Sequence, residues 1–338
     1  MTIVSILIVT WNSAEHLPRS LDSLKNQSHK DFEIILIDNG SIDGCVDAVT
    51  EKYPELDIYI KKLDKNTGFA VANNIGAQMA HGKWLALLNA DAFPEDDWLE
   101  QLLDATKQYP NAFFASRQIQ ANTPDLLDGE GDAYHVSGLA WRRNYGAPLQ
   151  KKSVVEEVFS PCAAAALYPK QEFLNVGGFD EEYFSYHEDI DLGFRLRLKG
   201  LRSYYLPEAV VHHVGSASTG KKSPFSIYYG HRNLEWTYYK NMPLLLFWIF
   251  FPLHLLVNIF FFIYFTLLGH GKVILRAKRD ALMRYGKMRH KRRAIQASRI
   301  ASTKDIYEAL NRDLFAPLKA TLQRRNFSIE RDDNVSNS

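Results

Sequence analysis

Four polar segments near the start of the chain each follow an apolar stretch, at the point where that stretch ends. They are Thr10-Trp11-Asn12, Asp38-Asn39-Gly40-Ser41, Asn66-Thr67-Gly68-Phe69 and Asn89-Ala90-Asp91. Ligands of an open parallel sheet bind outside the carboxyl ends of its strands. At such an edge one carboxylate can accept the imide N–H of uracil or thymine, and another can hold a divalent cation against a diphosphate. One such acid alone is typical of a solvated turn, whereas four segments at strand ends indicate a binding site.

Several other functional classes lack their motifs in this sequence. No G-x-G-x-x-G follows the first apolar stretch and no G-x-x-x-x-G-K-[ST] occurs, which disfavours a dinucleotide dehydrogenase and a P-loop NTPase. The two cysteines, Cys45 and Cys162, are too few for a disulfide framework and show no zinc-type spacing. We therefore interpret both as reduced thiols of a cytosolic protein.

The elements that position these residues alternate along the first half of the chain. Apolar, β-branched runs predict strands at Ile3–Thr10, Phe32–Asp38, Leu56–Lys61 and Lys83–Leu88. Helical patterns lie between them at Glu15–Gln27, Asp43–Lys52 and Phe69–Ala80. This alternation predicts an α/β fold with a mostly parallel, Rossmann-like sheet flanked by helices. With 338 residues, 46% of them hydrophobic, the chain is long enough for one such domain plus an appendage.

The second part of this region is less regular. Residues 120–160 are rich in Gly, Asp and Asn and predict loops near a site. Regular patterns then return as a strand at Pro161–Tyr168, a helix at Glu188–Lys199, extended segments at Leu201–Leu206 and Ala209–His213, and an aromatic-rich helix at Ser223–Tyr239.

The C-terminal third begins with an apolar run and continues with a basic one. Leu244–Leu268 contains no Lys, Arg, Asp or Glu, and a helix of that length at about 1.5 Å per residue would cross the roughly 30 Å hydrocarbon core of a bilayer. Residues 272–325 carry 16 Lys and Arg against 4 Asp and Glu, and the rest of the chain carries 24 against 35. A buried core helix is the alternative, but the basic stretch favours an anionic membrane surface. No nucleic-acid-binding motif accompanies the charge, so we expect no nucleic-acid partner.

Pro252 interrupts the apolar run, and both of its flanks are expected on one side of the membrane. No export signal opens the chain, and basic flanks stay in the cytosol. A proline inside a helix favours a kink, and His254 and Asn258 are polar. We therefore predict a re-entrant or shallow helical hairpin at the cytoplasmic face of the inner membrane, with a helix at Lys272–Arg293 on anionic head groups.

Six longer motifs resemble one family. SILIVTWNS, IDNGSIDG, NTGFAVANNIGA, LLNADAFPEDDWL, GGFDEEYFSYHEDIDLGFRLRLKG and VVHHVGSAS are similar to segments of the GT-A, family 2 glycosyltransferases. The resemblance covers roughly residues 3–240 and is closest to the rhamnosyltransferase-like branch of cell-surface polysaccharide synthesis. It implies an inverting transfer of a sugar such as rhamnose from a nucleotide-diphosphate donor to a lipid-linked glycan, with Mg²⁺ or Mn²⁺ as the cofactor.

On the donor side, the resemblance assigns roles residue by residue. The nucleotide- and donor-binding positions it implies are Thr10, Trp11, Asn12, Asp38, Gly68, Asn73, Asn89 and Asp91. Asp38 matches the acid that reads the base, and Asp91 matches the metal ligand of a D-x-D-type motif whose first acid is Asn89 here. Because only one carboxylate is left, we expect weak metal binding without nucleotide. His213 matches the histidine that completes the metal site, and His212 competes with it, since adjacent strand residues point to opposite faces.

On the acceptor side, the resemblance implies that Asp189 is the catalytic base and that Glu188 orients the acceptor. An inverting transfer needs such a base to take the proton of the acceptor hydroxyl. The alternative is that these acids only complement the dipole of the helix they begin. Arg232 either holds a phosphate of donor or acceptor or forms an ion pair with an acid of the sheet domain.

The sequence thus predicts three regions and leaves two functions open. The regions are a catalytic domain at 1–240, an apolar membrane-associated segment at 241–270 and a basic helical tail at 271–338. The first function is the glycosyltransferase described above. The second is a catalytically silent, sugar-nucleotide-binding or scaffold subunit of a polysaccharide assembly complex. Asp91, Glu188, Asp189 and His213 argue against the second, because a silent homologue has no need of all four.

Overall fold

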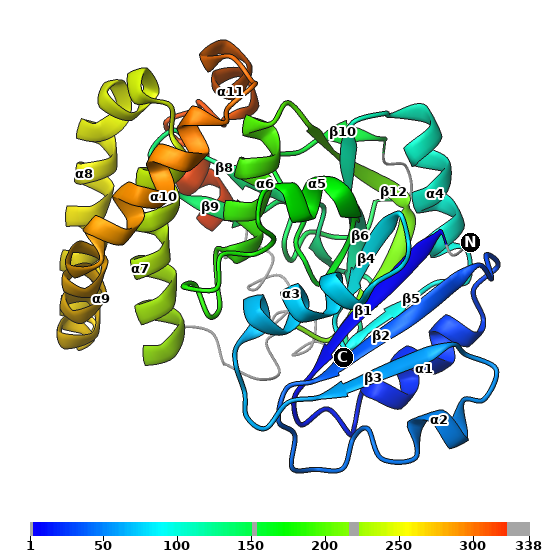
Figure 1. The fold of residues 1–338 in the computed structure, drawn as a ribbon. Coiled ribbons are helices and arrows are strands. Elements are labelled where there is room, and N and C mark those ends of the chain that lie inside the picture. Colours follow the sequence, from blue (N-terminus) through cyan, green and yellow to red (C-terminus); the bar gives the residue numbers. More distant parts are fainter. Residues whose placement is uncertain (1–2, 151–153, 216–222, 323–338) are drawn as a thin grey trace, which may run out of the picture.

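A central mixed sheet forms the core of the computed structural model, which describes residues 3–150, 154–215 and 223–322 (Figure 1). The strand order is β10-β12-β6-β11-β4-β1-β2-β3, with β5 paired to β12 and β7 to β6. The longer strands are β1 (Val4–Thr10), β2 (Phe32–Asp38), β3 (Ile58–Lys62), β4 (Trp84–Leu88), β6 (Ala112–Gln120), β11 (Ala165–Pro169) and β12 (Arg202–His213). The first four pair in parallel, as the sequence predicts, and β11 runs antiparallel between β4 and β6.

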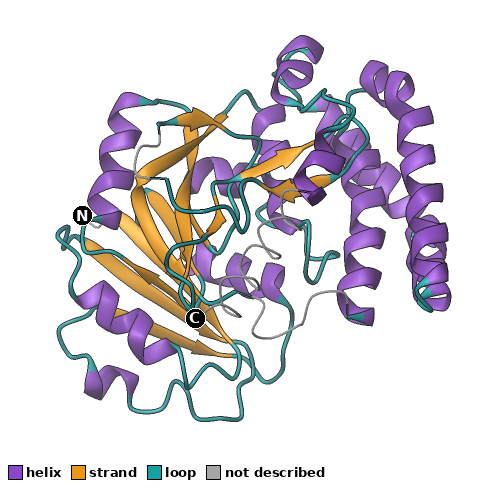
Figure 2. Cartoon of the chain, turned by 180° about the vertical axis from the view of Figure 1, so that it is seen from behind, coloured by secondary structure: helices purple, strands orange, loops and turns teal. Residues whose placement is uncertain are grey.

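Helices cover both faces of this sheet because β1 and β2 bury side chains on both sides (Figure 2). Ile6 and Ile34 pack under α1 (Leu17–Lys25), α2 (Val49–Lys52) and α4 (Trp98–Gln108). Leu7 and Ile35 pack under α3 (Phe69–Met79), α5 (Lys170–Asn175) and α6 (Glu188–Leu198). The α/β architecture expected from the sequence is confirmed.

The segment from 120 to 160 contains short strands where loops are expected. They are β7 (Leu127–Gly129), β8 (Asp132–Tyr134), β9 (Ala140–Arg142) and β10 (Glu156–Glu157), and an earlier short strand is β5 (Ala92–Pro94). The two extended segments expected around residue 207 are one strand, β12, whose register shifts between Leu206 and Val210. The helix expected at Asp43–Lys52 shortens to α2, because Gly44 and Ala48 both have positive φ.

Five helices form a bundle beside the sheet. They are α7 (Pro224–Asn241), α8 (Leu244–Leu267), α9 (Gly271–Met283), α10 (Tyr285–Ala297) and α11 (Thr303–Ala309). Ala281 of α9 and Met288 of α10 share a buried cluster with Trp236 of α7 and Tyr183. Lys291 pairs with Asp180, and both Arg284 and Lys287 pair with Glu182. Part of the basic tail therefore neutralises acids of the sheet domain.

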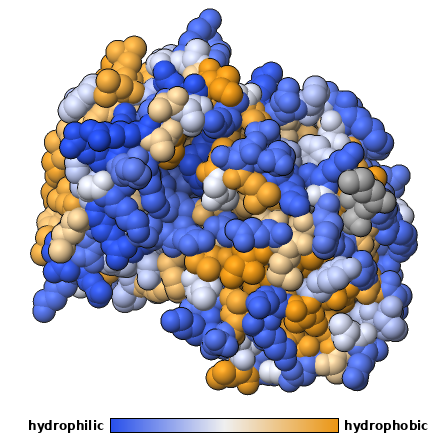
Figure 3. Space-filling model, viewed as in Figure 1, coloured by the Kyte–Doolittle hydropathy of each residue, from blue (hydrophilic) through white to orange (hydrophobic). Residues whose placement is uncertain are grey.

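The apolar run does not itself fold into the expected hairpin at Pro252. α8 continues through this residue from Leu244 to Leu267, and the chain turns only at Gly269, whose φ is +83°. Among the described residues there is one helix that is long enough and apolar enough to cross a membrane, and it is α8. Most of the surface of α8 is exposed. Its apolar surface forms the left edge of the molecule in Figure 3. The hairpin is thus made by α8 and α9, not within the apolar run.

Candidate active site

The carboxyl ends of β1 and β2 bring the predicted nucleotide residues together. Thr10 and Asp38 are direct partners in the parallel ladder. Asp38 is buried, and its Oδ1 accepts a hydrogen bond from the backbone N–H of Ser41 at 2.9 Å. Asn12 accepts from the N–H of Ile42, and Trp11 beside it is 45% exposed. This edge offers a fixed carboxylate and an aromatic surface on which a base can stack.

Gly68 lies against Phe184, in the loop that precedes α6. Its φ is +89°, and a Cβ there would lie 2.7 Å from the ring of Phe184. Asn39 orders the same turn, because its Oδ1 accepts from the N–H and the hydroxyl of Thr67. Asn73 is buried one turn along α3 and donates to the carbonyl oxygen of Phe69. Contact of Asn73 with the donor stays a prediction. The sequence did not indicate that Asn39 would hold the turn at Thr67.

Asp91 and His213 meet because β5 pairs with the end of β12. His213 Nε2 lies 3.3 Å from Asp91 Oδ1 and 3.4 Å from the amide nitrogen of Asn89. His212 points to the opposite side, where its Nε2 lies 3.2 Å from Glu95. The geometry therefore favours His213 over His212 as the partner of Asp91.

Asp128 contacts the other nitrogen of the His213 ring. Its Oδ2 lies 2.8 Å from His213 Nδ1, so the ring presents Nε2 to Asp91. Burial lowers the pKa of His213, but the hydrogen bonds and charges of Asp128 and Asp91 outweigh it and raise the pKa to about 8. The pKa of Asp91 is lowered, since His213 outweighs the opposing effect of burial. The only sequence signal for Asp128 was a weak one, the Gly- and Asp-rich composition of its segment.

These residues fit a divalent cation that is shared with a diphosphate. A histidine whose second nitrogen is held by a carboxylate is a common metal ligand, and an N/O donor pair suits Mn²⁺ or Mg²⁺. Within the described parts of the chain, no three His, Cys, Asp or Glu side chains gather to hold a metal. Asp91 and His213 would thus supply two ligands, and oxygens of the donor and water would have to supply the others. Binding at Nε2 would displace the proton from His213.

The acceptor-side acids begin α6 behind a strained loop. Phe184, Tyr186 and His187 all have φ between 64° and 68°, a region that bulky residues rarely adopt. The amide nitrogen of Asn233 donates to three carbonyl oxygens of this loop, at 2.8–3.1 Å. Arg232 donates to the carbonyl oxygens of Glu182 and Tyr183. Arg232 and Asn233 of α7 therefore hold the loop in shape; contact of Arg232 with a phosphate stays a prediction.

Glu188 and Asp189 are adjacent buried carboxyls, and the pKa values of both are raised. Burial and the charge of Asp189 raise the pKa of Glu188 to about 8, and Glu188 Oε2 is buried without a hydrogen-bond partner among the described residues. Burial also raises the pKa of Asp189, but the backbone N–H of Ile190 and the charge of Arg142 oppose the rise. Both neighbouring carboxyls therefore hold their protons more tightly than free acids do, because they are buried beside each other.

Arg142 interacts both with Asp128 beside His213 and with Asp189 at the start of α6. Its guanidinium donates to the carboxylate of Asp128 and, at 2.9 Å, to the sulfur of Cys162. A Cβ at Gly129 would lie 2.3 Å from Arg142 Cγ, so only glycine admits this packing. Burial raises the pKa of Cys162 to about 12, which keeps its thiol neutral. Nothing in the sequence marked Arg142.

A change of Arg142 to glutamine tests this connection. The positive charge of Arg142 lowers the pKa of Asp189, so Arg142→Gln raises that pKa. Because a catalytic base must be ionised, we expect the acidic limb of kcat/KM against pH to move to higher pH if Asp189 is the predicted base. Arg143→Gln is the matched control, since Arg143 pairs with the distant Glu156. An unchanged acidic limb in Arg142→Gln would show that Arg142 does not act on the base.

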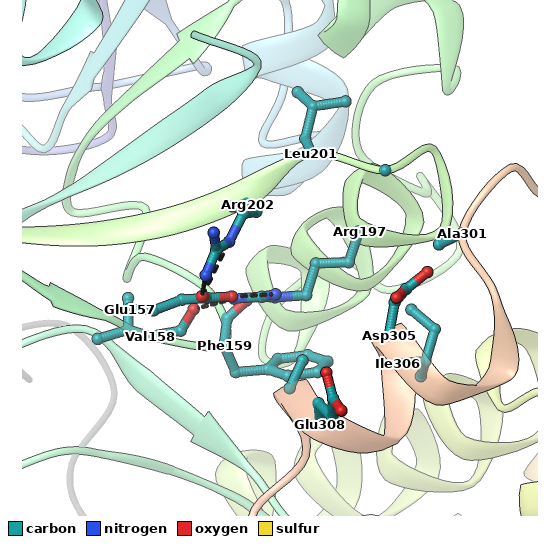
Figure 4. Close-up of a pocket in the computed structure, with 12 residues that line it drawn as sticks. Glu157, Val158, Phe159, Arg197, Leu201, Arg202, Ala301, Asp305, Ile306 and Glu308 are labelled. Carbon is teal, nitrogen blue, oxygen red and sulfur yellow. Dashed lines mark hydrogen bonds and ion pairs between the residues drawn. The ribbon is translucent and has the colours of Figure 1, made fainter. Parts of the chain in front are cut away.

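A separate cavity lies at the opposite end of β12 and α6 (Figure 4). Its volume is about 530 Å³. Arg197 and Arg202 both donate to Glu157 in its wall, at 3.0 and 2.9 Å. Because these charges satisfy one another and the strand ends that carry the donor residues lie far away, this cavity is not the substrate site.

The fold identifies the class of protein. A GalNAc-T7 structure with UDP, GalNAc and Mn²⁺ matches with a TM-score of 0.57 and 19% identity over 70% of this chain and 47% of that one. Staphylococcus aureus TarS 1–349 with UDP matches with a TM-score of 0.52 and 18% identity over 71% of this chain and 66% of that one. This chain spans about half of the GalNAc-T7 chain. The fold is that of the GT-A glycosyltransferases.

The sequence comparisons give the family. The model of glycosyl transferase family 2 matches residues 5–173. The N-acetylglucosaminyl-diphospho-decaprenol L-rhamnosyltransferase of Mycobacterium tuberculosis is 30% identical over 246 residues, which are 65% of this chain and 78% of that protein. The pre-mycofactocin glycosyltransferase of the same organism is 31% identical over 62% of this chain and 42% of its own length. The chain belongs to glycosyl transferase family 2.

Proposed function

We propose that this glycosyltransferase moves a sugar, with inversion, from a nucleotide-diphosphate donor to a lipid-linked glycan in cell-envelope polysaccharide synthesis. Rhamnose is the proposed sugar and N-acetylglucosaminyl-diphospho-polyprenol the proposed acceptor, as in the mycobacterial relative. One observation carries the proposal. The N–H of Asn89 donates to the carbonyl oxygen of Ala164, and the adjacent N–H of Ala163 lies 3.5 Å from Asp189 Oδ2. One short segment therefore links the proposed base to the donor motif.

The donor half of the mechanism follows from the strand ends. Asp38 accepts the imide N–H of the base, and Thr10, Trp11 and Asn12 line the nucleotide. Gly68 admits the loop that closes this pocket. Asp91 and His213 would hold the divalent cation, and Asn89 lies beside them. When bound, the cation supplies positive charge that offsets the charge of the leaving diphosphate.

The acceptor half uses the two acids in different protonation states. Protonated Glu188 donates a hydrogen bond that orients the acceptor. Ionised Asp189 takes the proton of the acceptor hydroxyl as its oxygen attacks the sugar carbon on the face opposite the diphosphate. The carbon–oxygen bond to the diphosphate breaks as the new bond forms, so the configuration inverts. Asp128, Arg142 and Asn233 act only by positioning.

We also propose that α8 brings the enzyme to the cytoplasmic face of an anionic membrane. Leu256 and Ile263 on its outer side are 64% and 53% exposed, and Arg276 and Arg279 of α9 are exposed beside it. Apolar side chains flanked by cations are typical of helices that bind an anionic bilayer.

A charge on the outer side of α8 tests this membrane contact. Leu256→Glu should weaken cosedimentation with phosphatidylglycerol vesicles about tenfold, because a carboxylate is costly in the acyl region. Ile42→Glu is the control, since Ile42 is 92% exposed on the sheet domain. Equal vesicle binding by both variants would exclude α8 as the membrane contact.

A further inference from the structure

A long apolar groove lies between α8 and the helices α7, α9 and α10, outside the catalytic site. Its volume is about 720 Å³, within the range of roughly 300–1,000 Å³ that is usual for ligand sites. The α8 wall runs from Leu244 to Phe262, about 27 Å at 1.5 Å per residue. The facing wall is formed by Trp236, Tyr239, Leu282, Tyr285 and Met288.

The shape and the mouth of the groove restrict its occupant. An α-helix with its side chains is about 10–12 Å across and would not fit this volume over this length, whereas a single hydrocarbon chain would. Three residues of the groove's lining, Leu244, Trp248 and Leu282, are 64%, 62% and 73% exposed. These exposed apolar side chains connect the groove with the apolar surface of α8.

The two ends of the groove differ in charge. Toward the C-terminal end of α8, Lys278 is neutralised by Glu235, which also accepts from His254 at 3.0 Å. At the other end, Arg292 donates to the carbonyl oxygen of Tyr239, and no carboxylate in the described part of the chain opposes its charge. The groove thus suits an amphiphile whose anionic group lies at the Arg292 end.

The Arg292 end lies toward the catalytic site. Lys291, the preceding residue, pairs with Asp180 in the segment that leads into the acceptor loop. α7 separates the two sites: its Asn233 holds the acceptor loop while its Trp236 lines the groove. The two sites therefore lie on different sides of one helix.

We propose that this groove binds the isoprenoid tail of the lipid-linked acceptor, with the diphosphate at the Arg292 end. The inference rests on the proposed function for the identity of the acceptor. The flat, methyl-branched isoprene units would pack against the aromatic walls, and the sugar would extend past α7 to Glu188 and Asp189. The groove would then select the lipid carrier, independently of the sugar that the catalytic site recognises.

Two adjacent tryptophan substitutions test the groove directly. Leu255 lines it and Leu256 does not, although both are exposed on α8, at 47% and 64%. Binding of decaprenyl phosphate in detergent micelles, followed by native mass spectrometry, should weaken at least tenfold in Leu255→Trp and stay unchanged in Leu256→Trp. Excess phosphatidylglycerol should not displace the decaprenyl phosphate. Equal binding by the two variants, or displacement by phosphatidylglycerol, would overturn the proposal.

A kinetic comparison separates this inference from the proposed function. With N-acetylglucosaminyl-diphospho-decaprenol, Leu255→Trp should raise KM about tenfold. With the same head group on a short alkyl chain, its KM and kcat should match those of the wild type, which also shows that the variant folds. If Leu255→Trp does not fold, Ile259→Trp replaces it, since Ile259 lines the same groove. Failure of the wild type on both acceptors would refute the proposed function. The binding experiment would still show whether the groove binds the isoprenoid chain.

Discussion

Asp189→Asn should lower kcat about 10³-fold while leaving donor binding unchanged. The amide keeps the size of the side chain and can still accept the N–H of Ile190, which lies 2.8 Å from Asp189 Oδ1, but it cannot take the proton of the acceptor hydroxyl. Loss of a general base costs typically 10²–10⁴-fold. The measurement is single-turnover transfer, with the dissociation constant of the nucleotide diphosphate determined in parallel.

Asp191→Asn is a useful comparison for this variant. Asp191 lies one turn inside α6 and pairs with Arg195 and Lys240, so its carboxylate supports the fold. That change should lower the free energy of unfolding, because it weakens a buried ion pair. Near-normal turnover by Asp189→Asn would remove Asp189 from the role of base, and an equal loss of stability in both variants would make its effect structural.

Asp91→Ala should abolish the part of donor binding that depends on the metal. Among the described residues, Asp91 supplies the carboxylate that lies against His213 Nε2, and the neighbouring Asn89 supplies only an amide. Calorimetry with a nucleoside diphosphate should show affinity that rises at least tenfold with Mn²⁺ in the wild type and does not rise in the variant. Glu95→Ala is the control, because Glu95 pairs with His212 on the other side of β12. Unchanged Mn²⁺ dependence in Asp91→Ala would move the metal site elsewhere.

The part of the site that could be predicted consists of residues at the ends of strands, because the periodicity of apolar residues shows where a strand ends. Buried runs end where the chain leaves the sheet, so the apolar pattern predicts Thr10 and Asp38 at the same edge of the sheet, where the structure pairs them. The motif at Asn89-Ala90-Asp91 could be placed in the same way. The choice between His212 and His213 needed the register of β12 against β5, and β12 carries a bulge in its pairing with β6 that no periodicity shows.

The positioning residues could not be predicted because their partners are remote in sequence. Asp128 reaches His213 across 85 positions. Both Asp128 and Arg142 lie in strands of three residues, too short for an alternating pattern to show. Asn233 supports a loop some fifty positions away.

The charge asymmetry was visible in the sequence, but its pairing was not. Composition predicts a basic tail that is available to a membrane, whereas Lys291, Lys287 and Arg284 point inward to acids of the sheet domain. Pro252 likewise favours a hairpin within the apolar run, whereas α8 continues through it and packs against α9, since a proline removes only one backbone hydrogen bond. In both cases tertiary contacts decide between local alternatives.

The central claim is that this chain transfers a sugar from a nucleotide diphosphate to a lipid-linked acceptor. The most direct measurement incubates the purified full chain with deoxythymidine-diphosphate rhamnose, Mn²⁺ and N-acetylglucosaminyl-diphospho-decaprenol, beside a panel of other nucleotide sugars. The account predicts release of nucleoside diphosphate that requires both the acceptor and the metal, with an inverted linkage in the product. No acceptor-dependent release from any donor of the panel would contradict it.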